Sequence, residues 1–223
     1  ISATDTSTIK SDIVSTSLAI APVGIAVGLT TANDTYGSNV SAYIADAEVT
    51  AGNGDVSTLA TSQPTIETRS LVAALSISIG VAGAGAESHT TIEGTTSAYN
   101  ENATLTAANK NVIVNATSTS LANPTNTGGA AGLAAVSVVR SNAHIGGKTE
   151  AYVGGETKVA ANQLSVKAED KNTATPTTHV GSVGLAAGAI ADAVGKIDRK
   201  TESFIATNSK IEAGETTLTF DAK

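Results

Sequence analysis

The residue types that most often perform catalysis or bind metals are few in this sequence and lie far apart. Its three histidines are His89, His144 and His179, and no two of them have the spacing of a metal site. The sequence contains no cysteine, so a disulfide framework, a thiolate metal site and a thiol nucleophile are all excluded. No Gly-x-Ser-x-Gly segment is present to hold a nucleophilic serine on a sharp turn. We therefore expect the histidines to be solvated or to cap strand ends.

Carboxylates are the next candidates, because some parallel β-helix proteins cleave polysaccharides with acidic side chains that converge on one face. Such a site uses paired carboxylates as acid and base, or several of them to bind calcium. Here they are scattered one or two to a turn: Asp46, Glu48, Glu67, Glu101, Glu150, Glu156, Glu212 and Glu215. Asn53-Gly54-Asp55 is a single fragment of the tandem repeat that builds a calcium β-roll. The sequence therefore predicts no catalytic, metal-binding or cofactor-binding residue.

The composition narrows the range of partners. The formal net charge is −7 at pH 7, and because neutralising phosphates requires clustered Lys and Arg, we expect no nucleic-acid partner. Charged residues make up 15% of the chain, against roughly 25% in ordinary soluble domains, and Thr, Ser and Asn carry the polarity instead. The charge-free segment Ser70–Ala86 is near the lower length limit for a membrane helix. Because this segment is rich in Gly, Ala and Ser, we expect no membrane span.

The elements that must carry these residues repeat along the chain. An aromatic residue recurs at Tyr43, Tyr99, Tyr152 and Phe204, after steps of 56, 53 and 52 residues. Each aromatic residue is followed by an apolar residue six or seven positions later, and then by a short alternating run. Self-similarity at such a period is typical of stacked structural units. We therefore predict that these four residues form a structural repeat ladder rather than a binding site.

A second recurring element is rich in Gly, Ala and aliphatic residues, with copies at about 17–29, 70–86, 128–139 and 180–194. In the second copy the larger residues occupy the odd positions from 71 to 81, which predicts a strand with one large-residue face and one small-residue face. For Leu185–Lys200 an Ala-rich helix is the alternative. Prolines cannot donate to a ladder, so Pro64, Pro124 and Pro176 are expected at corners or connections, and Pro22 predicts an irregularity in the first unit.

Together these patterns predict an all-β, repetitive parallel β-solenoid (β-helix) with four copies of a repeat of 52 to 56 residues. The chain is one array, with repeats at about 1–63, 64–120, 121–172 and 173–223. Ladders of Val, Ile and Leu are expected to fill the interior. Each repeat is expected to hold two to three coils, in a rod about 20 Å across. The alternative is a row of tandem small β-sandwich modules, whose small size would make an independent core marginal.

The phrase that begins Ala42-Tyr43-Ile44 and continues through Val49-Thr50-Ala51-Gly52 resembles repeats of giant bacterial surface proteins. The family is that of the leukotoxin-like filamentous adhesins of anaerobic Gram-negative bacteria, within the broader filamentous-haemagglutinin type. The resemblance covers nearly the whole chain, and Asn100 departs from it, because a polar residue follows the tyrosine there. It implies a secreted or outer-membrane-associated β-solenoid stalk used in adhesion or aggregation. It supplies no catalytic residues.

The sequence thus predicts a non-catalytic structural and adhesive segment of a bacterial surface filament, outside the cell or on its surface. Its expected partners are further copies of itself or a receptor on a host or bacterial surface. Because Ile1 is not a start residue, we expect a processed product or an excised piece. Two alternatives stay open: a carbohydrate-active or glycan-binding β-helix protein, and an ice-binding face built from Thr-x-Thr sites such as Thr104–Thr106.

Overall fold

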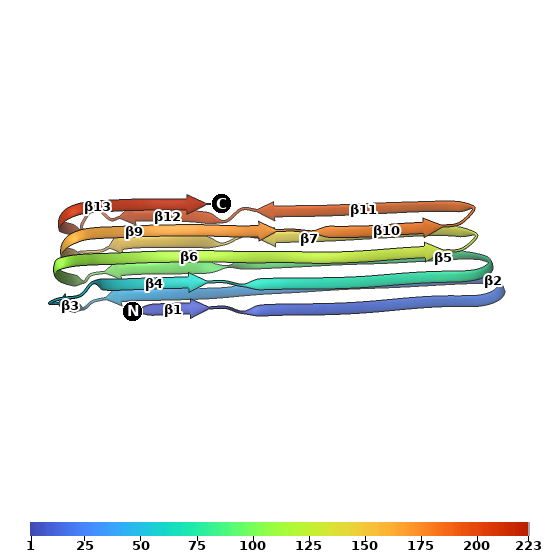
Figure 1. Cartoon of the computed structure of the whole chain (residues 1–223), viewed down its shortest axis with the longest axis horizontal. Helices are drawn as coiled ribbons and strands as arrows, with labels where there is room; N and C mark the ends of the chain where they lie inside the picture. Colours follow the sequence, from blue (N-terminus) through green and yellow to red (C-terminus); the bar gives the residue numbers. More distant parts are fainter. Residues whose placement is uncertain (223) are drawn as a thin grey trace.

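The computed structural model describes residues 1–222, which form a flattened parallel β-solenoid without a helix (Figure 1). Its strands are β1 (Ser2–Asp5), β2 (Thr8–Ala45), β3 (Glu48–Ala51), β4 (Val56–Ser62), β5 (Thr65–Glu101), β6 (Thr104–Ala131), β7 (Ala134–Ile145), β8 (Lys148–Gly154), β9 (Lys158–Ala174), β10 (Thr177–Val183), β11 (Ala186–Ile197), β12 (Lys200–Ile205) and β13 (Lys210–Ala222). The predicted solenoid is confirmed. The alternative prediction of a helix at Leu185–Lys200 is wrong, because β11 is a strand.

Strand pairing shows that one repeat is one coil. Tyr43 pairs with Tyr99, Tyr99 with Tyr152, and Tyr152 with Phe204, so every residue meets its equivalent one repeat later. All strand pairings among the described residues are parallel and belong to one sheet, which excludes tandem sandwich modules. The expectation of two to three coils per repeat is wrong. A run such as Val56–Ile77 is about 70 Å long at about 3.3 Å per residue, so the molecule is a broad, flat coil rather than a narrow rod.

Each coil has two long sides that run in opposite directions (Figure 1). The forward layer holds β1, β2 up to Ile20, β4, β5 up to Ile77, β6 from Val112, β9 from Gln163, β10 and the end of β13. The return layer holds β2 from Val23, β5 from Ile79, β7, β8, β11 and β12. At one end, short corner strands join the layers: β3 and the first residues of β6, β9 and β13. We call this the wide end, comprising residues 40–60, 96–116, 149–168 and 201–213.

The corners use the residues that tight backbone turns demand. Asp46 and Asn102 have φ values of 50° and 51°, and Gly155 has 60°, at the point where each coil leaves the return layer. Asn and Asp tolerate this left-handed region better than other non-glycine residues, because their short side chains bond nearby backbone groups. Asn102 does so, since its Oδ1 accepts the N–H of Glu156 in the next coil at 3.1 Å. At the opposite end the register shifts between Ile20 and Val23, at the irregularity predicted for Pro22.

Large aliphatic side chains fill the interior mainly at the wide end, and Ile66, Ile92 and Ile145 form a smaller buried cluster in the middle of the coils. There Leu105, Val112, Val153, Val159 and Leu164 are almost fully buried in a single cluster. The corner strands supply a third wall, and this keeps the two layers far enough apart for branched side chains. This part of the interior consists of the Val, Ile and Leu ladders that the sequence predicts.

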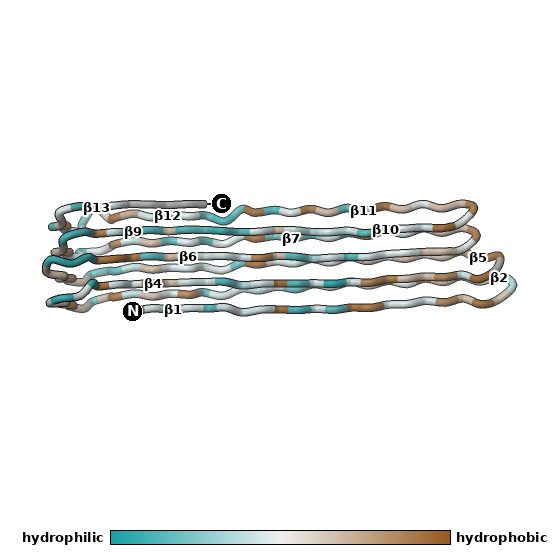
Figure 2. Tube along the Cα trace, viewed as in Figure 1, coloured by the Kyte–Doolittle hydropathy of each residue, from teal (hydrophilic) through white to brown (hydrophobic). Residues whose placement is uncertain are grey.

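At the opposite end, mainly small side chains fill the interior. We call it the narrow end, comprising residues 13–30, 70–86, 126–139 and 178–191. Its interior holds small residues such as Ala26, Ala82 and Ala135. A Cβ added at Gly28 would lie 2.9 Å from Cγ2 of the inward-facing Val72, so the two layers leave room for a valine here only where the facing residue is glycine. The expectation that Val, Ile and Leu line the interior throughout is therefore wrong at this end, where most of them are exposed. Figure 2 shows the apolar segments of the chain that lie at this end.

Two further observations concern the predicted organisation. The described residues include no helix with the length and apolar character needed to cross a membrane. The last residue of the fourth predicted repeat, Lys223, lies outside the described residues.

Candidate functional site

The aromatic residues stack into a column on the outer face of the return layer. Ring centroids are 5.1 Å apart for Tyr43 and Tyr99, 4.9 Å for Tyr99 and Tyr152, and 4.9 Å for Tyr152 and Phe204. The interplanar angles are 8°, 2° and 3°, because parallel in-register strands repeat the same rotamer at the strand spacing of about 4.8 Å. Ring faces inside the column are therefore covered by neighbouring rings, and only edges and the two outer faces meet solvent.

The column makes two of its phenols, Tyr99 and Tyr152, weaker acids. Burial raises the pKa of Tyr152 to about 12, and the nearby Glu101 carboxylate adds to the effect. Burial likewise raises the pKa of Tyr99. Both phenols thus stay neutral near neutral pH, and the column acts as a stabilising stack without a ready proton donor or nucleophile.

Beside the column runs a ladder of alternating charges. The Lys148 ammonium contacts the carboxylates of Glu150 and Glu202, the latter at 3.0 Å, and Lys200 also contacts Glu202. Ser97 donates to Glu150 at 3.0 Å. The hydrogen bond to Glu150 is the main cause that raises the pKa of Lys148. The Lys148–Glu202 pair and the Ser97–Glu150 hydrogen bond cross from coil to coil, so they reinforce the stacking of the third coil on its neighbours.

The carboxylates and histidines singled out in the sequence stay dispersed. Glu67 pairs with Lys10 at 2.9 Å, and His89 pairs with Glu87 at 3.1 Å. His144 lies 2.6 Å from Asp198 on the outer face of the return layer. His179 is exposed in β10. Among residues 1–222, no group of three or more His, Asp or Glu side chains is arranged to hold a metal ion.

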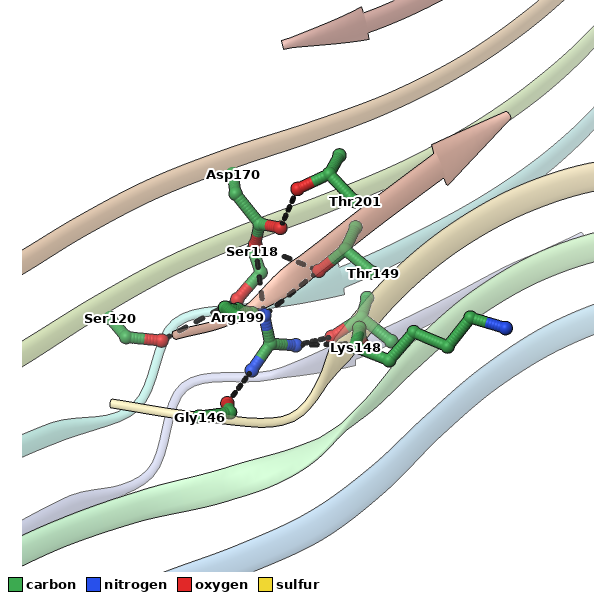
Figure 3. A network of polar contacts seen from close by, with 9 residues as sticks. Ser118, Ser120, Gly146, Lys148, Thr149, Asp170, Arg199 and Thr201 are labelled. Atoms are coloured by element: carbon green, nitrogen blue, oxygen red, sulfur yellow. Dashed lines mark hydrogen bonds and ion pairs between the residues drawn. The ribbon is translucent and has the colours of Figure 1, made fainter. Parts of the chain in front are cut away.

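The most tightly built polar cluster is one that the sequence does not reveal. Arg199 and Asp170 form an ion pair inside the fourth coil, with Nε to Oδ1 at 2.9 Å and side chains only 4% and 1% exposed (Figure 3). Arg199 also donates to the carbonyls of Gly146 and Lys148, each at 2.9 Å, and to Thr149 Oγ1 at 3.0 Å. The pair therefore ties the forward layer of the fourth coil to the return layer of the third.

The register of the parallel strands explains how Asp170 and Arg199 come to face each other. Asp170 continues the inward-facing column Asp5, Ser62 and Ser118, one residue per coil. Thr149 and Thr201 donate to its carboxylate from the return layer. Arg199 occupies the place that Gly147 holds in the third coil and Gly94 in the second. Burial lowers the pKa of the Arg199 guanidinium, an effect that Asp170 opposes. The sequence shows an acidic residue at Asp170 where the second and third coils have serine, but only the strand register identifies Arg199 as its partner.

Asn100 breaks the apolar ladder Ile44–Asn100–Val153–Ile205, as its position after the tyrosine indicated. Its side chain is fully buried, and Oδ1 accepts a hydrogen bond of 2.8 Å from Thr58. The Nδ2 atom has no hydrogen-bond partner. This amide lies among the buried apolar residues of the wide end, where an unpaired polar group costs stability.

The outer surface of the narrow end carries many exposed apolar side chains. On the forward layer it includes Leu18, Leu71, Leu75 and Ile77, between 42% and 58% exposed. A shallow groove of about 660 Å³ crosses all four coils there. Monomeric proteins rarely expose contiguous apolar patches beyond a few hundred Å² without a binding role. This surface is therefore the strongest candidate for a contact with another molecule.

Comparisons of this chain with protein-family models, curated proteins and solved structures return no match.

Proposed function

We propose that this chain is a structural and adhesive segment of a secreted or surface-displayed bacterial filament, without catalytic activity, that acts by association with itself or with a surface receptor. The observation that carries the proposal is the in-register stacking of four like coils. Each coil satisfies its backbone hydrogen bonds through its neighbours, so every added coil makes the array longer and enlarges its lateral surface.

The side-chain ladders support the same function. The aromatic column and the Lys148–Glu202 crossing pair add contacts between coils rather than a pocket. Asn53, Asn109 and Asn208 are exposed at the wide end, while the apolar surface of the narrow end offers an association face. A glycan-binding surface has weaker support, because sugars stack on open aromatic faces and the inner faces of this column are already covered.

The test is display of the chain on the outer surface of a non-adherent bacterium. We expect the displayed chain to cause cell clumping or attachment to a host-cell layer. A displayed unrelated domain of similar size is the control. Display at normal surface density with neither clumping nor attachment would contradict the proposal, and binding to a defined oligosaccharide on a glycan panel would favour the carbohydrate alternative instead.

A further inference from the structure

We propose that the forward face of the narrow end binds the same face of a second copy of this chain in a two-fold, face-to-face dimer. The inference rests on the self-association part of the proposed function and names the surface that performs it. The surface that this face binds is therefore an uncharged, apolar, flat sheet face of identical sequence.

The narrow end differs from the rest of the molecule in charge. No Asp, Glu, Lys or Arg lies within 13–30, 70–86, 126–139 or 178–191, although the chain holds 33 such residues. The outward positions carry Val14, Leu18 and Ile20 in the first coil, 67%, 58% and 72% exposed. Exposed Leu71, Leu75 and Ile77 lie beside them in the second coil. Fully burying such a side chain is worth about 1.5–3 kcal/mol, so leaving this many in water has a substantial free-energy cost.

The shape of this face complements itself. A lane of small side chains runs through all four coils: Thr16, Ala73, Gly129 and Gly181. Next to it runs a higher ridge: Leu18, Leu75, Ala131 and Val183. In each coil the ridge residue is larger than its lane neighbour. A two-fold axis parallel to the stacking direction, placed between lane and ridge, sets each ridge over the lane of the other copy with the coils level. Leu75 then lies over Ala73 of the second copy, and Leu18 over Thr16.

The area fits a specific but modest interface. About ten residues at about 3.3 Å and four coils at about 4.8 Å give an overlap on the order of 600 Å² per copy. The total of about 1,200 Å² is at the lower end of specific protein interfaces. The charged group Lys10, Asp12, Glu67 and Arg69 borders this face. In the two-fold arrangement these charges fall at or beyond the partner's corner near Pro22 and keep their solvent, so no charge is buried.

The return face of the narrow end is a less suitable dimer surface, and a lipid surface is a less suitable partner for the forward face. On the return face of the narrow end, the comparable column alternates Val27, Gly83, Val136 and Gly188, so no continuous lane exists. A lipid surface is disfavoured because membrane-contacting proteins place aromatic and basic residues at the rim of the apolar zone. Here the basic residues at the border, Lys10 and Arg69, lie beside the acidic Asp12 and Glu67, the stacked tyrosines lie at the wide end, and the chain has no tryptophan. A second copy therefore fits this face best.

The experiment measures sedimentation velocity of the chain over a concentration series. We expect a monomer–dimer equilibrium, which Leu75→Glu weakens at least about tenfold because the carboxylate would be buried unpaired in the lane of the partner. Ala73→Leu should weaken it as well, by filling the lane. The matched control is Ile25→Glu, which places the same charge on the return face, where the side chain is 73% exposed. Circular dichroism confirms that each variant is folded; all three positions point outward, so the coils should form.

Three outcomes would overturn the inference. The first is a wild-type chain that stays monomeric at every concentration. The second is a dimer that Ile25→Glu disrupts and Leu75→Glu leaves intact. The third is a chain that binds uncharged phosphatidylcholine vesicles through Leu75 without dimerising. The proposed function fails separately: cells that display the Leu75→Glu chain and clump as strongly as wild type would refute this interface but not the adhesive function.

Discussion

Replacing Asp170 by Ser and Arg199 by Gly, singly and together, tests how the fourth coil holds a buried ion pair. These substitutions copy the third coil, which has Ser118 and Gly147 at the equivalent places. In Asp170→Ser the guanidinium, 4% exposed, loses its counter-charge. Leaving a buried charge unpaired costs about 3–5 kcal/mol, so we expect a loss of that size.

The double variant should behave differently. It removes both charges and restores the composition that the third coil already tolerates, so we expect it to be within about 2 kcal/mol of wild type. Arg199→Gly alone should fall between the two, because Thr149 and Thr201 still donate to the Asp170 carboxylate. The resulting coupling energy between the two positions is at least about 3 kcal/mol.

Urea unfolding followed by circular dichroism gives the free energies of unfolding for the four members of this cycle. Repeat arrays can open locally, so amide hydrogen exchange at Lys200 and Thr201 gives a second reading close to the substitution. The reasoning is refuted if Asp170→Ser costs less than about 1 kcal/mol, or if the double variant loses as much as the two single variants together.

Three other predictions follow from the ladders. Tyr99→Ala should cost about 2–3 kcal/mol in urea unfolding and Tyr43→Ala about 1, because Tyr99 stacks on two rings and Tyr43 on one; equal losses would contradict the column. Hydrogen bonds from Lys167 and Lys171 lower the pKa of Glu169 to about 2, so wild-type stability should fall between pH 4.5 and 2 while Glu169→Gln lacks that step. Thr58→Val with Asn100→Val should raise the unfolding free energy by about 1–2 kcal/mol by removing the unpaired Nδ2; a less stable double variant would contradict this.

The periodic residues of the sequence account for much of the fold. The return of an aromatic residue at Tyr43, Tyr99, Tyr152 and Phe204 is enough to predict stacked units, because in-register parallel strands place equivalent residues side by side. Alternation of large and small residues is enough to predict strands in the first two Gly- and Ala-rich segments, whereas for β11 a helix stayed open and the pairing with β7 decides for a strand. Turn chemistry at Asn102 could also be anticipated from residue type.

The sequence by itself determined the strands, the period and the ladders, since these depend on local side-chain alternation and on a repeat that any reader can count. Only the tertiary structure decided which face of each strand is the inside. Alternation defines two faces equally well, and the choice between them depends on the spacing of the two layers. That spacing is wide where β3 and its equivalents form a third wall, and narrow where Gly28 meets Val72. The outward orientation of Leu18 and Leu75 follows from the spacing of the two layers. The pairing of Arg199 with Asp170 follows from the strand register, which no local pattern reveals.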